Sequence, residues 1–174
     1  MSSSGSDLHA ARLGRLGLRR VVAQGGALVE APRFEVDPTF PKPLPNNWLI
    51  GMAIGIGVDA QDHIWIVHRP DTLSANEVAA DQKPATAMCC SAAPPVLEFD
   101  SAGNLLRSWG GPGQGYEWPQ SNHGIFVDHK GIVWIGGNGT NDAHVLKFTQ
   151  DGKFLAQYGH AGKTAGSNDT SNFG

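Results

Sequence analysis

Gly55-Ile-Gly-Val-Asp59, followed by Ile64-Trp-Ile66, decides the fold, because this stretch occurs twice. It returns as Gly124-Ile-Phe-Val-Asp128, followed by Val133-Trp-Ile135, with every matched position shifted by 69 residues. A repeat that recurs position by position indicates that one structural unit is used twice, so it sets the fold before any single residue does.

A second matched stretch locates an insertion inside the first copy. Val96-Leu-Glu-Phe99 returns as Val145-Leu-Lys-Phe148 with a shift of only 49 residues. The first copy therefore contains 20 extra residues, which we place at about 70–92.

Each copy predicts four short strands with β-branched and aromatic interiors. A glycine lies at the same place in the last turn of both copies, Gly103 and Gly152, where a hairpin needs a positive φ. Asp59 and Asp128 follow the first strands, where an aspartate side chain can bond turn amides. The predicted strands are 55–59, 63–68, 96–99 and 105–109 in the first copy, and 124–128, 132–136, 145–148 and 154–158 in the second.

Four strands per repeat with turn glycines are typical of a β-propeller blade. We therefore predict an all-β partial propeller over residues 33–174, with blades at 52–110 and 123–160; a plain eight-stranded meander or sandwich is the alternative. Phe34-Glu-Val-Asp37 and Asn47-Trp-Leu-Ile50 predict the outer half of a further blade, at 33–51. Two and a half blades cannot close a ring, so we expect an N-terminal fragment of a longer protein that self-associates when isolated.

Composition excludes some function classes. The net charge of −3 with no basic stripe gives nucleic-acid binding no electrostatic support. No apolar run reaches the length of a membrane span. Residues 1–32 are expected to form a disordered or signal-like tail, which is a poor secretion signal, so the compartment is unknown. If the true N-terminus lies upstream, we expect an extracytoplasmic location. Cys89 and Cys90 are interpreted as free thiols or a local disulfide, with a redox or metal role as the alternative.

The blade pattern resembles the NHL repeat and, within NHL propellers, the bacterial proteins similar to peptidyl-α-hydroxyglycine amidating lyase. Three features carry this resemblance: His68-Arg69-Pro70 after the second strand, the insertion that follows it, and Asn122-His123-Gly124 before the second blade. The resemblance covers about residues 33–174 and implies a six-bladed ring.

The resemblance also implies roles for four residues. His123 matches a zinc ligand and Arg69 matches an active-site arginine that contacts the substrate. Ile56 and Ile125 match positions whose backbone carbonyls hold a structural calcium ion, and converging carbonyl oxygens suit such a hard cation. Catalytic zinc needs about three protein ligands, so this chain alone is not expected to bind zinc or calcium tightly.

Two functions follow as expectations. The first is a zinc-dependent lyase that converts a peptidyl-α-hydroxyglycine to an amide and glyoxylate, with activity only in a full-length protein. The second is a non-enzymatic propeller that binds a protein, peptide or glycan through the 70–92 insertion. Trp65 and Trp134 are interpreted as blade-packing residues, and Tyr116-Glu-Trp118 as a cover for the blade interface, with a ligand site as its alternative. We interpret four other histidines as surface residues: His63, His129, His144 and His160.

Overall fold

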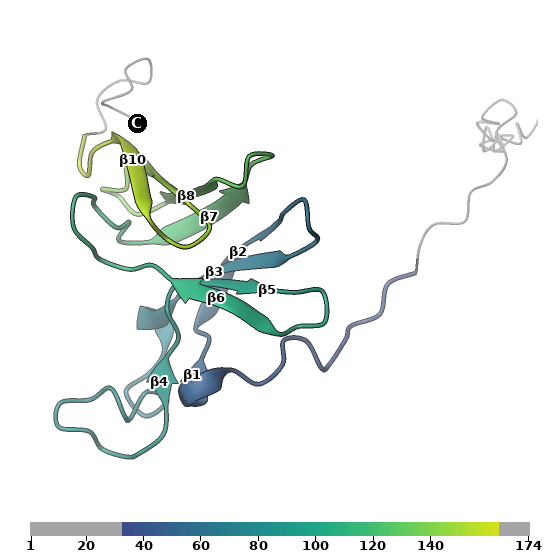
Figure 1. Ribbon diagram of the computed structural model, residues 1–174. Helices are drawn as coiled ribbons and strands as arrows, with labels where there is room; N and C mark the ends of the chain where they lie inside the picture. The colour runs from purple at the N-terminus through teal and green to yellow at the C-terminus, as the bar shows by residue number, and fades with distance from the viewer. Residues whose placement is uncertain (1–32, 164–174) are drawn as a thin grey trace, which may run out of the picture. The chain divides into compact units, whose positions relative to one another are not determined.

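The computed structural model describes residues 33–163 and divides the chain after Val36. Residues 37–163 form an all-β unit built around two four-stranded antiparallel sheets (Figure 1). The strand order is β2-β3-β5-β6 in the first sheet and β7-β8-β9-β10 in the second, so each sheet is a meander of consecutive strands. The first sheet consists of β2 (Met52–Val58), β3 (Ile64–Arg69), β5 (Val96–Phe99) and β6 (Leu105–Trp109); the second consists of β7 (Asn122–Val127), β8 (Val133–Gly137), β9 (His144–Phe148) and β10 (Phe154–Gly159).

All eight strands predicted from the repeat are present, with ends that shift by a few residues. The two sheets also share irregularities: the register shifts between Ala53 and Gly55 in β2 and at the equivalent place between Asn122 and Gly124 in β7. The turn glycines adopt the predicted left-handed conformation, with φ of 84° at Gly103 and 81° at Gly152. The sequence repeat is therefore a structural repeat.

The predicted aspartate turns are confirmed in both copies. Asp59 Oδ1 accepts hydrogen bonds from the amides of Gln61 and His63, and its Oδ2 accepts one from the Trp65 indole at 3.0 Å. In the second sheet, Asp128 Oδ1 accepts the amides of Lys130 and Ile132, while Oδ2 accepts the Trp134 indole at 3.1 Å. Each repeat thus closes its first turn with its own aspartate and its own tryptophan.

The two sheets stack through opposite faces. Successive side chains of a strand point to opposite faces of the sheet, so neighbouring residues of one strand lie on different faces. Trp65, Val67 and Val96 of the first sheet form one buried cluster with the face of the second sheet that carries Ile125 and Ile135. Strands β2 and β7 lie against each other at this junction (Figure 1). Tyr116 and Trp118 pack against the same cluster, which agrees with their predicted role as an interface cover.

The second sheet leaves the face equivalent to Trp65 uncovered. Trp134 on this face stacks on Tyr158 with ring centroids 5.9 Å apart, and Lys147 Nζ lies 4.9 Å from the Trp134 ring centroid. Phe126 on the same face is 62% exposed. Trp134 therefore does not pack between sheets as Trp65 does, because no sheet within residues 33–163 packs against this face.

The outer part of the first sheet's other face is covered by the chain that precedes it. Leu97 and Phe99 form a buried cluster against Phe40, Leu44 and Trp48. A short 3-10 turn, η1 (Pro45–Asn47), leads into β1 (Trp48–Leu49), which pairs in parallel with β4 (Ser91–Ala92) at the end of the insertion. A second short turn, η2 (Pro70–Thr72), begins that insertion.

The predicted strand at 34–37 is wrong. These residues have no strand partner, Phe34 and Val36 remain exposed, and Asp37 instead accepts the Thr39 amide at 2.8 Å in a turn. Only β1, inside the predicted strand 47–50, forms, and it pairs with the insertion. The predicted tail at 1–32 lies outside the described residues. No helix within residues 33–163 has the length and apolar character needed to cross a membrane.

Candidate functional site

Arg69, predicted to contact substrate, ends β3 and links the two sheets. Its Nε donates to the carbonyl oxygen of Asn122 at 3.1 Å, and its Nη2 donates to Oδ1 of Asn138 at 2.9 Å. The buried Asn122 side chain returns a hydrogen bond from Nδ2 to the carbonyl oxygen of His68 at 2.9 Å. Two strands from different repeats are thereby joined at one edge through Arg69, Asn122 and Asn138, which we call the Arg69 junction.

His123 lies directly beside this junction. It follows Asn122 on β7, and its side chain is exposed. The Arg69 guanidinium therefore binds the carbonyl of the residue just before His123, although Arg69 and His123 are 54 positions apart in the chain. The structure brings these two predicted site residues to the same edge of the stacked sheets.

Ile56 and Ile125 occupy equivalent register positions on the neighbouring strands β2 and β7. Ile56 pairs with Ile66, and Ile125 pairs with Ile135. Their side chains differ in environment, since Ile56 is 69% exposed whereas Ile125 is buried against the first sheet. Their predicted equivalence is confirmed, and the calcium role of their carbonyls stays a prediction.

Glycine permits the close approach of β2 and β7 beside His123. A Cβ atom placed on Gly55 would lie 2.7 Å from the carbonyl oxygen of His123 and 2.7 Å from Cγ1 of Val67. Contacts this short with backbone cannot be relieved by turning one side chain. The absence of a side chain at Gly55 therefore leaves room for the His123 backbone to lie against the first sheet.

An apolar groove opens next to the Arg69 junction and shares Asn122 with it. It has a volume of about 340 Å³ and a mainly apolar lining that includes a few polar residues. Such a lining suits a small apolar or aromatic group that is oriented by a few hydrogen bonds. The groove is lined by Pro70, Asp71, Pro95, Gly111, Pro112, Trp118, Pro119, Gln120 and Asn122.

His123 alone does not form a metal site. Within residues 33–163, His123 belongs to no group of three or more metal-binding side chains. One imidazole cannot hold catalytic zinc, so further ligands would have to come from outside the described residues.

The described part of the chain contains one group of side chains with the spacing of metal ligands. Its members are Asp59, His63 and Glu98, whose potential ligand atoms lie within 4.8 Å of one another. These groups already bind one another. His63 Nδ1 lies 2.9 Å from Glu98 Oε1, and Arg107 pairs with the second Glu98 oxygen. Burial raises the pKa of Asp59, but the hydrogen bonds from Trp65, His63 and Gln61 outweigh it and lower that pKa overall. We interpret this set as an ion-pair network that anchors the fully buried Glu98.

Two histidines are more buried than predicted from sequence. His144 was expected at the surface, but it is buried, with Nε2 donating to the Glu117 carbonyl at 2.6 Å. His63 is half-buried in the Glu98 network. Both predictions failed because a histidine near a strand end can fold back on a loop carbonyl or carboxylate, which strand position alone does not reveal.

His68 is a structural residue of the junction. Its Nδ1 accepts the Gly51 amide at 3.2 Å, so the ring proton lies on Nε2, which donates to the Pro94 carbonyl at 2.9 Å. Burial lowers the pKa of His68, against a smaller opposing effect of the backbone carbonyls. The neutral ring thus fixes the end of β3 just before Arg69.

Sequence reasoning missed the two asparagines that hold Arg69. One signal was available in the sequence, because the 69-residue shift makes Asn138 the equivalent of Arg69 in the second copy. Equivalent positions in adjacent repeats lie at the same end of their strands, so a polar pair there could have been proposed.

Comparison of the chain with models of protein families and with curated proteins found no match.

Proposed function

We propose that this chain is part of a propeller of NHL type whose complete ring acts as a lyase similar to peptidyl-α-hydroxyglycine amidating lyase. One observation carries the proposal: Arg69, which the resemblance implies contacts substrate, and His123, which it implies binds zinc, lie at one edge of the stacked sheets and are linked through Asn122. Ile56 and Ile125 lie on the two adjacent strands that would line a central channel.

The stacking of the sheets supports a propeller over a sandwich. The face of the first sheet that carries Trp65 packs on the opposite face of the second, and within residues 33–163 no further sheet packs on the equivalent Trp134 face. Contacts between unlike faces propagate from sheet to sheet and close into a ring when the rotation allows. A two-sheet sandwich instead buries one face of each sheet and needs no further unit.

In this proposal the described residues bind and orient the substrate. Nε and Nη2 of Arg69 are engaged by Asn122 and Asn138, so the guanidinium is held in place and its Nη1, which makes no hydrogen bond to any described residue, is available for a carboxylate. His123 would hold zinc together with ligands from elsewhere, and the metal would supply Lewis-acid chemistry at the substrate hydroxyl.

The test uses the full-length product of the gene. We expect about one zinc ion per molecule beyond any structural metal, and conversion of N-benzoyl-α-hydroxyglycine to benzamide and glyoxylate. His123→Ala should lose zinc and activity together, while His129→Ala, which alters an exposed turn histidine of the same sheet, should keep both. Absence of stoichiometric zinc, or full activity of His123→Ala, would refute the lyase proposal.

The groove beside Asn122 favours a second candidate, a binding scaffold for peptides with a bulky apolar side chain. Its Trp118 wall is formed by a segment without a counterpart in the repeat. Calorimetric titration with dipeptide amides that carry phenylalanine or aspartate would test it. Binding of the phenylalanine peptide that is weakened about tenfold by Trp118→Ala, without any turnover, would support the scaffold, and equal binding of both peptides would exclude it.

A further inference from the structure

The insertion between β3 and β5 carries the only two cysteines of the chain, and they are adjacent. Cys89 and Cys90 form a disulfide with each other, which confirms the local-disulfide alternative and leaves no free thiol. With no third cysteine, this disulfide has no competing partner within one molecule.

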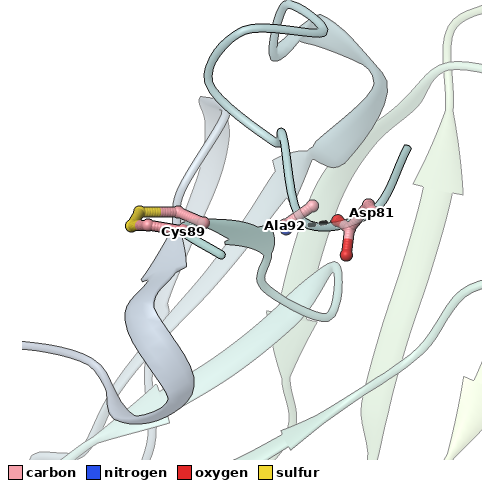
Figure 2. Close-up of a disulfide and its surroundings, with 4 residues drawn as sticks. Asp81, Cys89 and Ala92 are labelled. Carbon is pink, nitrogen blue, oxygen red and sulfur yellow. Dashed lines mark hydrogen bonds between the residues drawn. A yellow bond between two sulfur atoms is a disulfide. The ribbon is translucent and has the colours of Figure 1, made fainter. Parts of the chain in front are cut away.

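Solvent reaches this sulfur pair. Cys89 is exposed, Cys90 is half-buried, and the neighbouring Met88 side chain is almost fully exposed. Figure 2 shows the disulfide pointing away from the hydrogen bond that joins the Asp81 carboxylate to the Ala92 amide at 2.9 Å. A disulfide that links neighbouring residues cannot hold two distant segments together. Its place in the fold therefore gives it no bracing role and leaves it open to attack by a thiol.

The backbone around the pair is held independently of the sulfurs. The carbonyl of Cys90 accepts the Ala80 amide at 3.2 Å, and Ser91–Ala92 form strand β4 against β1. The Ala93 amide continues this contact by donating to the Leu49 carbonyl at 2.9 Å. The two side chains thus stay on the same surface loop whether the sulfurs are joined or not.

We propose that Cys89 and Cys90 form a reversible thiol–disulfide exchange site, and that the reduced pair captures thiophilic trivalent arsenicals. In the exchange a thiolate of a small dithiol attacks Sγ of Cys89, the sulfur–sulfur bond breaks, and Sγ of Cys90 leaves as a thiolate that takes up a proton. The second thiol of the reductant then attacks the mixed disulfide and releases Cys89. Two electrons and two protons pass to the protein, and the reductant leaves as a cyclic disulfide.

The reduced pair suits a soft ligand because its two sulfurs are one residue apart. A monosubstituted arsenic oxide condenses with two thiols, forming two arsenic–sulfur bonds and releasing one water. The second bond forms within the molecule and so benefits from a high effective concentration, which a single thiol cannot provide.

The first experiment measures accessibility on the full 174-residue chain. Protein equilibrated with oxidised dithiothreitol should take up no maleimide, and after reduction it should take up two. Reduction of the native protein should proceed within about tenfold of the rate for the urea-unfolded chain, since attack depends on access to the sulfur. Two labels before reduction, or a native rate slower than this limit, would overturn the proposal.

The second experiment uses phenylarsine oxide as the probe and intact mass as the readout. Reduced protein should bind one molecule with loss of one water, and Cys90→Ser and Cys89→Ser should each bind at least about 100-fold more weakly. Far-ultraviolet circular dichroism checks that both variants keep the strand content. Equal capture by either serine variant would place the adduct elsewhere and refute the site.

Discussion

Replacement of Gly55 by alanine tests the stacking of the two sheets most directly. The added methyl group would lie 2.7 Å from the His123 carbonyl oxygen, 2.7 Å from Val67 Cγ1 and 3.3 Å from the Ile125 amide nitrogen. Two of these atoms are backbone and Val67 is fully buried, so β2 and β7 must move apart. Overpacking of this kind costs about 1–3 kcal/mol.

The repeat supplies a matched control at the equivalent position. A Cβ on Gly124 meets nothing within 4 Å, although Gly124 has the same place in its strand. Gly124→Ala should therefore leave stability unchanged or raise it by up to about 1 kcal/mol, because alanine loses less conformational freedom than glycine on folding. Both variants are alanine substitutions in a first strand, so only the contact with the neighbouring sheet differs.

Urea unfolding followed by tryptophan fluorescence measures both variants against the wild type. We expect a lower midpoint for Gly55→Ala at an unchanged slope, which indicates a loss of stability and not of compactness. In thermal melts the same loss corresponds to about 2–4 °C per kcal/mol for a chain of this size. Equal free energies of unfolding for the two variants would show that β2 and β7 do not approach closely, and the stacked arrangement would have to be abandoned.

Three further predictions concern protonation and the open sheet face. The Trp134 indole and the turn amides lower the pKa of Asp128 from its ordinary 3.8. The contribution of Asp128 to the free energy of unfolding is therefore present above pH 3.8 and is lost as the pH falls through the lowered value. Melting temperatures between pH 6 and 2.5 should fall less for Asp128→Asn than for the wild type. Burial lowers the pKa of His68 below its ordinary 6.5, so the unfolded chain binds more protons and stability should decline as the pH drops from 7.5 through 6.5 to the lowered value. His68→Gln should flatten that decline, and an identical pH profile would contradict the buried neutral ring. Phe126→Ser should weaken self-association of the isolated chain in sedimentation velocity, since it removes apolar surface from the open face; a wild type that stays monomeric at all concentrations would contradict this prediction.

The repeat made the local structure predictable from the sequence. The two copies carry the same strand patterns, turn glycine and turn aspartate, so each assignment made in one copy could be checked against the other. Asp59 and Asp128 were expected to bond turn amides and do so. Their further bonds to Trp65 and Trp134 were not foreseen, because a tryptophan six residues away is placed by the hairpin and not by local sequence.

Features without a second copy were harder to predict. The Phe34-Glu-Val-Asp37 segment alternates apolar and charged residues as a strand does. It does not form a strand, because no described segment pairs with its backbone amides. The Arg69 junction depends on how one sheet lies against the next, which the pattern within a strand does not encode. His144 turns inward to a loop carbonyl supplied by Glu117, 27 positions earlier in the chain.

The closure of each repeat by its own aspartate and tryptophan has a consequence for how such chains can change. Because these bonds lie at the opposite ends of the strands from the loop after β3, lengthening that loop leaves the closure intact. The first repeat carries about 20 extra residues there, whereas in the second repeat Asp142 ties the matching loop to the amides of Gln120, Ser121 and Gly139. The two repeats therefore differ in length at the loop after their second strand while they keep the same aspartate–tryptophan closure.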